Sequence, residues 1–362
     1  MEVHVHKCNL RRYRSAVLFK YGVFLFVLIS CNNSELGFKN ELLENYTLST
    51  LNDWVVIRSD TLIAKKIYDS NNDMMARIAR IAVIEEVDSL NIWVADPLRG
   101  YIIEMKNNSI NTFNKVVLKN GNGPSEVIRP SAIHKNDKES SEIYVLDSEQ
   151  GCLIIVDREG TESERRCSSN IPTSMMSVNI KVVDNYLYLN TLQDPSFTIL
   201  ELGKDLSMRK GISPRIVPIG YQPITHNHTV FDLDNKSLVF SYRGLPFLFN
   251  RKIDEIEGDA VNLIPDLDLS DYNVSLEPKN EKINVGVNNV IRDVFLVDEK
   301  VYLSLYTTLY VLDFRTKSYK KVDFINSNYD EIKFHMMYAS SNNIYLVDQF
   351  HNMIYKISKN AI

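Results

Sequence analysis

Polar residues that could do chemistry stand where apolar runs of the chain end. Asp96, Asp147 and Asp348 each follow such a run, where a carboxylate could ligate a divalent cation or accept hydrogen bonds from the next turn. His226 and His228 have alternate-residue spacing, which would place both imidazoles on one face of a strand. Spacing identifies no third ligand, so we expect turn caps and unpaired histidines, with no metal site and no cofactor.

Motifs of the common hydrolases and redox proteins are absent from the sequence. It contains no Gly-x-Ser-x-Gly, no His-Glu-x-x-His and no Cys-x-x-Cys. The composition, 44% hydrophobic and 24% charged, is that of an ordinary globular protein with a sizeable core. A binding function is therefore a simpler expectation than catalysis.

A repeat of strand–turn–strand units must position these polar residues. Two short apolar runs, 143–146 and 153–156, are separated by the turn residues 147–151, as in a β-hairpin. Related hairpins begin at residues 92, 187, 238, 301 and 344, and another apolar run lies about ten residues before each. A weaker fourth run often follows. The pattern predicts an all-β, six-bladed β-propeller of four-stranded antiparallel blades, whereas a pair of β-sandwiches would not explain six copies of one hairpin.

The ends of the chain must close such a ring. The sixth unit stops after its third strand, and residues 53–63 precede the first unit without a hairpin of their own. We expect residues 53–63 to supply the missing outer strand of the last blade, which removes an exposed sheet edge.

The N-terminus has the features of a secretory signal. Basic residues precede the apolar run 23–29, and too few apolar residues run together for a membrane span. Residues 28–31, Leu-Ile-Ser-Cys, resemble the lipobox of bacterial lipoproteins, which implies lipidation of Cys31; an ordinary signal peptide is the alternative. We expect a signal at 1–30, a polar tether at 31–50 and the propeller at 51–362.

The net charge and the cysteines indicate which classes of partner and which cellular compartment are compatible with the sequence. Loss of residues 1–30 removes five basic residues and one acid, so the remaining chain is more acidic than the formal charge of −5 of the whole sequence. That balance argues against a nucleic-acid partner. Cys152 and Cys167 flank the turn at 157–160 and would lie nearly opposite each other on adjacent strands. They could form a disulfide in an oxidising compartment or remain two buried thiols.

Residues 121–126, Gly-Asn-Gly-Pro-Ser-Glu, carry a family resemblance. A Gly-x-Gly-Pro-x-Glu loop between two blades, with the Tyr-Val-Leu-Asp hairpin and the lipobox, resembles the TolB-like or NHL-like six-bladed propeller lipoproteins of Bacteroidetes type. The family often carries Arg at the position of Asn122 and Gly at that of Ser125. Most members have no assigned activity, so the resemblance implies the fold and an outer-membrane lipid anchor. The loop lacks the Gly-Lys-Ser/Thr of a phosphate loop, and its Glu126 could simply accept backbone hydrogen bonds.

One face of the predicted ring collects the loops between second and third strands and the loops between blades. Its charged residues could bind a protein, peptide or glycan. They are Arg99, Glu126, Arg129, Arg243 and His351. The alternative is a metal-dependent enzyme of the lactonase or lyase kind, with a site in the central channel. The inner strands offer it only a mixed set without a ring of carboxylates: Arg80, His134, Asn179, Asp232 and Asp293.

Overall fold

The structure is a computed structural model, and it describes most of the chain after residue 40. The described residues are 41–69, 77–85, 90–106, 115–135, 142–173, 178–218, 228–234, 236–266, 274–275, 291–305, 307–340, 342–348 and 352–362. The predicted signal at 1–30, Cys31, His226 and His351 lie outside them.

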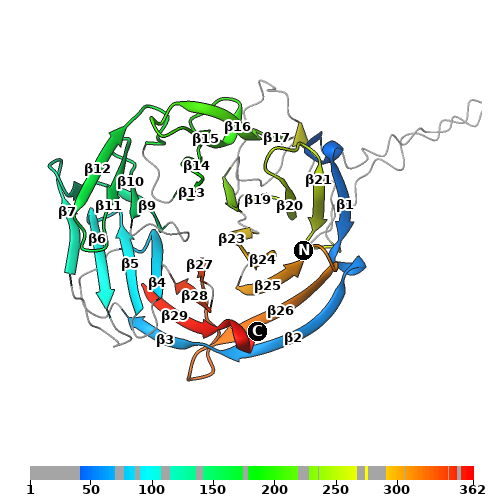
Figure 1. Ribbon diagram of the computed structural model, residues 1–362. Coiled ribbons are helices and arrows are strands. Elements are labelled where there is room, and N and C mark those ends of the chain that lie inside the picture. The colour runs from blue at the N-terminus through cyan, green and yellow to red at the C-terminus, as the bar shows by residue number, and fades with distance from the viewer. Residues whose placement is uncertain are drawn as a thin grey trace, which may run out of the picture. The chain divides into compact units, whose positions relative to one another are not determined.

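The described chain forms six blades around a central channel, as Figure 1 shows. From the channel outward, blade 1 contains β4 (Arg80–Glu85), β5 (Leu90–Asp96), β6 (Tyr101–Lys106), β7 (Lys115–Asn120) and the short β8 (Glu126–Val127). Blade 2 contains β9 (Pro130–Lys135), β10 (Ile143–Asp147), β11 (Cys152–Val156) and β12 (Glu162–Cys167). Blade 3 contains β13 (Ile180–Val183), β14 (Tyr186–Asn190), β15 (Phe197–Leu202) and β16 (Met208–Pro214).

The other three blades incorporate strands from the start of the described chain. Blade 4 contains β18 (Thr229–Leu233), β19 (Ser237–Tyr242), β20 (Phe247–Lys252), β21 (Gly258–Asn262) and, outermost, β1 (Tyr46–Thr50). Blade 5 contains β23 (Ile291–Val297), β24 (Lys300–Leu305), β25 (Thr308–Asp313), β26 (Ser318–Ile325) and β2 (Val55–Ile63). Blade 6 contains β27 (Met336–Ala339), β28 (Asn343–Asp348), β29 (Met353–Ser358) and β3 (Lys65–Asp69). A separate pair joins β17 (Val217–Pro218) to β22 (Val274–Ser275).

The hydrophobic core consists of layers between neighbouring blades. Between blades 1 and 2, for example, the buried side chains of Trp93 and Ile102 belong to one cluster with Val145 and Ile154. Because side chains of a strand alternate between the two faces of its sheet, each blade can contribute to two layers. The short β-branched and aromatic runs of the sequence are therefore buried on both faces, and the six-bladed fold is as predicted.

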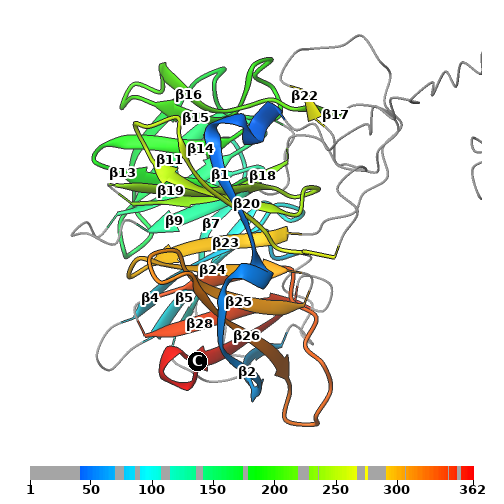
Figure 2. The same cartoon turned by 90° about the vertical axis from the view of Figure 1, so that its right-hand side faces the viewer.

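The strand that closes the ring is not the predicted one. β3 pairs antiparallel with β29, with Tyr68 opposite Ile354, and so completes blade 6. The predicted segment instead forms β2, which adds a fifth strand to blade 5 by pairing in parallel with β26. Burial explains the difference, since Ile67 and Tyr68 of β3 are buried between blades, whereas most of β2 is exposed on the outer rim (Figures 1 and 2).

The predicted tether and the predicted blade size also need correction. Residues 41–50 form a 3-10 turn, η2 (Glu41–Asn45), and β1, which pairs in parallel with β21. Leu42 is buried, and the ring centroids of Tyr46 and Phe249 are 4.9 Å apart, so this stretch packs as part of the propeller. With β1, β2 and β8 added, blades 1, 4 and 5 have five strands, and the added strands run parallel to their neighbours.

Helical structure is minor. Besides η2, the described helices are the 3-10 turns η3 (Leu51–Asp53) and η5 (Lys359–Ala361). None of the helices in the described ranges has the length and apolar character needed to cross a bilayer.

Cys152 and Cys167 face each other on β11 and β12, and a disulfide joins them across a sequence separation of 15. The bond holds the outermost strand of blade 2 to the buried strand beside it. Its geometry follows from the register, which places the two Cα atoms 4.0 Å apart.

Replacing both cysteines by serine is expected to lower the free energy of unfolding by about 3 kcal/mol, because the crosslink restricts the unfolded chain. Urea denaturation of the parent protein and of the Cys152→Ser, Cys167→Ser variant measures this difference. Addition of a reductant should destabilise the parent by a similar amount and leave the variant unchanged. Equal midpoints for parent and variant would show that the bridge contributes nothing.

Candidate ligand-binding site in the central channel

The six inner strands enclose a cavity of about 520 Å³. β4, β9, β13, β18, β23 and β27 all contribute to its wall, so each blade supplies part of the lining. Residues 234, 298 and 340 also line it, and they belong to the turns that follow three of the inner strands. The cavity thus lies toward the face of the ring that carries these turns, and not toward the loop face predicted to bind a ligand.

Arg80 crosses the channel at the base of this cavity. From β4 in blade 1, its guanidinium Nη1 donates to Oδ2 of Asp293 in blade 5 at 2.8 Å, and Nη2 donates to Oδ1 of Asn179 in blade 3. Arg80 is 7% exposed and Asp293 is fully buried. A buried ion pair with additional hydrogen bonds is retained because removal of either partner leaves an uncompensated charge.

Carboxylates of the inner strands also join adjacent blades. Oδ2 of Asp293 accepts the backbone N–H of Met337 in blade 6 at 3.2 Å. Asp232 in blade 4 accepts the N–H of Leu296 in blade 5 at 2.8 Å, and Nζ of Lys181 in blade 3 lies 3.0 Å from its Oδ1. Burial raises the pKa of Asp232, and Lys181 and the backbone donors oppose that shift. These contacts give the cavity a rigid polar wall.

His134 presents an unsatisfied polar atom in the cavity lining. Its side chain is buried, and within the described part of the chain its Nε2 has no hydrogen-bond partner. Burial, with the nearby charge of Lys181, holds the pKa of His134 well below its usual value. The imidazole is therefore neutral at physiological pH. His134 lines the cavity, but its Nε2 is closed off from solvent, so a ligand would contact the other atoms of the ring.

Apolar side chains complete the cavity. Phe231, Phe295 and Met337 line it beside the polar groups. The ring of Phe295 packs edge-on against Tyr338, with 5.7 Å between the ring centroids. An apolar wall with a few fixed polar groups is typical of sites that bind small organic ligands.

The aspartates that follow the hairpin strands cap turns. Oδ1 of Asp96 accepts the N–H of Leu98 at 3.0 Å and that of Arg99 at 3.2 Å. Asp147 likewise accepts N–H groups of its own turn and of Ile128 in the preceding interblade loop. Within the described ranges no three His, Cys, Asp or Glu side chains gather as a metal site would require. The described residues therefore give the metal-enzyme alternative no ligand set.

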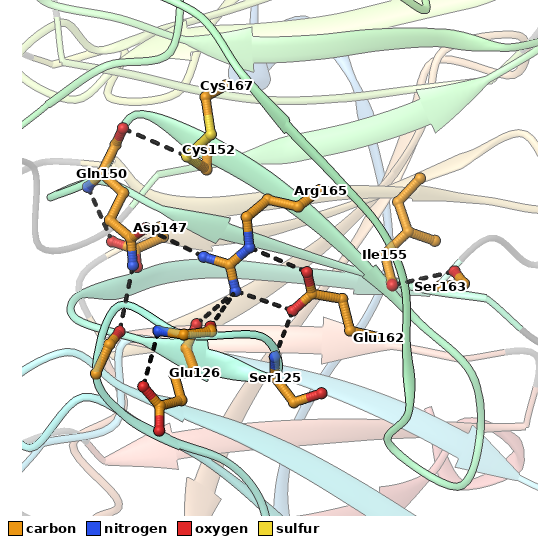
Figure 3. A network of polar contacts seen from close by, with 12 residues as sticks. Ser125, Glu126, Asp147, Gln150, Cys152, Ile155, Glu162, Ser163, Arg165 and Cys167 are labelled. Carbon is orange, nitrogen blue, oxygen red and sulfur yellow. Dashed lines mark hydrogen bonds and ion pairs between the residues drawn. A yellow bond between two sulfur atoms is a disulfide. The ribbon is translucent and has the colours of Figure 1, made fainter.

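The Gly-x-Gly-Pro-x-Glu loop is stabilised by contacts within blades 1 and 2 (Figure 3). Oε2 of Glu126 accepts the N–H of Gly123 at 2.8 Å, and this bond and nearby Lys119 lower the pKa of Glu126. A Cβ at Gly121 would lie 2.0 Å from the same oxygen, so only glycine fits there. Ser125 has a φ of 56°, a left-handed conformation that favours glycine.

Arg165 of β12 connects this loop to the rest of blade 2. It donates to the carbonyl oxygens of Gly123 and Glu126, at 3.2 and 2.7 Å, and to both carboxylate oxygens of Glu162. Glu162 in turn accepts the N–H of Ser125 at 2.6 Å. These bonds fix the conformation of the loop. Glu126 accepts a backbone N–H, which confirms the prediction that it acts as a hydrogen-bond acceptor for the loop backbone.

The residues predicted on the loop face have separate roles. Arg129 pairs with Glu149 at 3.0 Å, and the carbonyl oxygen of Arg99 accepts from the side-chain amide of Asn120. Arg243 lies instead near the end of the channel, close enough to Arg80 and Asp293 for their charges to shift its pKa. Their use as one ligand-binding surface stays a prediction, with His351 outside the described residues.

Sequence reasoning missed Arg165, Lys181 and Arg292. Arg292 and Lys181 interrupt inner-strand runs that are otherwise apolar, and that interruption is the signal by which they could have been found. Arg165 gives no such signal, because it lies on a mostly exposed outer strand.

Comparison with known proteins supports the fold alone. No protein-family model matches the sequence, and no curated protein matches it. Among solved structures, a protein of Bacteroides fragilis NCTC 9343, provisionally described as exported, matches at a TM-score of 0.51 and 8% identity, over 83% of this chain and 99% of its own. A DUF4221 family member from Bacteroides vulgatus also matches at a TM-score of 0.51, with 11% identity over 82% of this chain and 96% of its own.

Proposed function

We propose that this protein is a non-catalytic binding propeller that holds a short peptide or a glycan unit in its central cavity. The observation that carries the proposal is the cavity of about 520 Å³, to which all six inner strands contribute. Its volume lies within the range of roughly 300–1,000 Å³ that is usual for ligand pockets.

The polar groups of the cavity suit a ligand with several hydrogen-bonding groups. Neutral His134 contributes a polar ring to the cavity wall, and the Lys181–Asp232 pair contributes both a cation and a carboxylate. Phe231 and Phe295 provide apolar faces for a sugar ring or an apolar side chain. Lys181, Asp232 and Phe295 are held by interblade contacts, so binding to them would require little reorganisation.

We further propose that binding takes place in the cell envelope, with the propeller attached to the outer membrane through lipid on Cys31. The resemblance of residues 28–31 to a lipobox supports this, and so does the Cys152–Cys167 disulfide, since disulfides persist outside the reducing cytosol. The provisional description of the Bacteroides fragilis structure as an exported protein is in keeping with such a location.

A binding screen with a matched pair of variants tests the cavity. The chain from residue 38 onward is titrated calorimetrically with a panel of di- to tetrapeptides and mono- to trisaccharides. His134→Leu is expected to weaken capture of the best ligand about tenfold or more, because it removes a polar group from the cavity wall. Its melting temperature should change little, since the lost Nε2 has no partner among the described residues.

Arg315→Ala serves as the control, because Arg315 is an exposed turn residue on the outer part of blade 5. It should bind as the parent does. If His134→Leu binds the ligand as well as the parent does, the ligand does not bind in the cavity. Arg99, Glu126 and Arg129 on the loop face would then be the residues to replace.

A further inference from the structure

Three arginines lie near one another at the base of the 520 Å³ cavity, and one of them, Arg80, also lines that cavity. Arg80 begins β4, Arg292 lies at the irregularity near the start of β23, and Arg243 follows directly on β19. The carbonyl oxygen of Arg243 accepts the backbone N–H of Ile291 at 3.2 Å, which places Arg243 against the start of β23. The segments that present these side chains are thus held together by the backbone.

Within the described ranges, Asp293 is the one carboxylate that acts on this group, and both of its oxygens already accept hydrogen bonds. Oδ2 of Asp293 accepts from Nη1 of Arg80 at 2.8 Å and from the N–H of Met337 at 3.2 Å. Oδ1 accepts the N–H of Val294 at 3.2 Å. Asp293 therefore supplies the counter-charge of Arg80, and among the described residues it accepts from no second guanidinium.

Arg243 and Arg292 have no such partner. Across the described ranges neither side chain makes a hydrogen bond or an ion pair, and the buried Nε atoms of Arg80, Arg243 and Arg292 all lack an acceptor. Burial lowers the pKa of Arg292, and burial together with the charge of Arg80 lowers the pKa of Arg243 to about 10. Both still carry their charge at neutral pH, in surroundings that disfavour it.

We propose that Arg80, Arg243 and Arg292 form an anion-binding site that takes an oxyanion group, either a carboxylate or a sulfate or phosphate ester. Guanidinium groups recognise oxyanions through paired N–H donors, and such charge-assisted bonds are roughly twice as strong as neutral ones. A bound oxyanion would offset the excess positive charge and satisfy the free donors. The site shares Arg80 with the cavity that His134 lines, so the tests below replace only Arg243 and Arg292, which do not line that cavity.

Two variants remove the unpaired cations without touching the Arg80–Asp293 pair. Arg243→Gln and Arg292→Gln are compared with the parent and with Arg315→Ala, an exposed arginine in a turn of blade 5. Sodium sulfate, phosphate and acetate serve as probes against chloride at equal ionic strength, with thermal unfolding and calorimetry as readouts. Stronger binding of sulfate or phosphate than of acetate would indicate a sulfate or phosphate ester as the ligand. Stronger binding of acetate would indicate a carboxylate.

The parent and Arg315→Ala are expected to show a saturable rise in melting temperature with at least one probe. Each glutamine variant should bind that probe about tenfold or more weakly, since it loses a charge-assisted contact. Without anion, both variants should unfold at the parent temperature or above it, because repulsion among the cations is relieved. A rise that is linear in salt and equal in all four proteins would reflect general salting-out and overturn the proposal. So would a loss of stability in the glutamine variants without anion, since it would assign the arginines a structural role.

Discussion

Replacing Asp293 by alanine is expected to destabilise the propeller by about 3–5 kcal/mol, because it leaves the buried Arg80 without its counter-charge. The loss extends beyond one ion pair. Asp293 also accepts the N–H of Met337, so the contact between blades 5 and 6 at the channel is weakened. Arg243 and Arg292 contribute further positive charge nearby, which increases the cost of the unpaired Arg80.

Thermal unfolding measures this effect, and a fall in melting temperature of roughly 5–10 °C is expected for a domain of this size. The double variant Arg80→Met, Asp293→Leu is the control. It removes both charges and replaces them with apolar groups of similar size, so it should recover most of the lost stability. The single variants Arg80→Met and Asp293→Leu complete the cycle, and the stability of the double variant relative to the sum of these two changes gives the coupling energy. A single Asp293→Ala variant as stable as the parent would show that the pair does not support the channel.

Removal of β3 is expected to abolish cooperative folding, whereas removal of β1 and β2 alone is not. Three chains are compared, beginning at residue 38, at Ala64 and at residue 70. The second lacks the outer strands of blades 4 and 5 but keeps β3, so the ring stays closed. The third loses Ile67 and Tyr68 from the buried layer between blades 6 and 1 and leaves β29 as an open edge.

Burial of each of these two side chains contributes about 1.5–3 kcal/mol, which is a large share of a total stability of about 5–15 kcal/mol. Circular dichroism with urea titration should show a single sharp transition for the chains from residues 38 and 64. The chain from residue 64 should be the less stable of these two, because Leu42, Leu51 and Trp54 are also lost from the core. A sharp, parent-like transition in the chain from residue 70 would contradict closure by β3.

The two truncated chains also distinguish closure by β3, which the structure shows, from closure by residues 53–63, which the sequence predicted. If residues 53–63 closed the ring, the chain from residue 64 would already fail to fold cooperatively. The sequence favoured β2 over β3, because β2 has the longer apolar stretches, whereas β3 has only Ile67 and Tyr68 between charged residues. What distinguishes them is which run is buried between blades, and that depends on the position of β29, almost 300 residues later in the chain.

In the candidate site, too, the sequence predicted the residues but not their contacts. Sequence reasoning named Arg80, His134, Asn179, Asp232 and Asp293 as polar residues of the inner strands, and all five line or adjoin the channel. It did not predict that Arg80 joins Asp293 and Asn179, since these partners lie 213 and 99 residues away. It also grouped Arg243 with the loop face, because its position after β19 is equivalent to that of Arg99 after β5.

The sequence by itself determined the repeating hairpins, the six blades and the turn-capping role of aspartates such as Asp96 and Asp147. Each of these depends on alternation and turn chemistry within a few residues, which local order preserves. Long-range packing settles which strand closes the ring, which polar side chains meet in the channel and which arginines have no partner among the described residues. Those outcomes depend on burial and charge between blades far apart in sequence, where Asp293 pairs with Arg80 while Arg243 and Arg292 have no side-chain partner among the described residues.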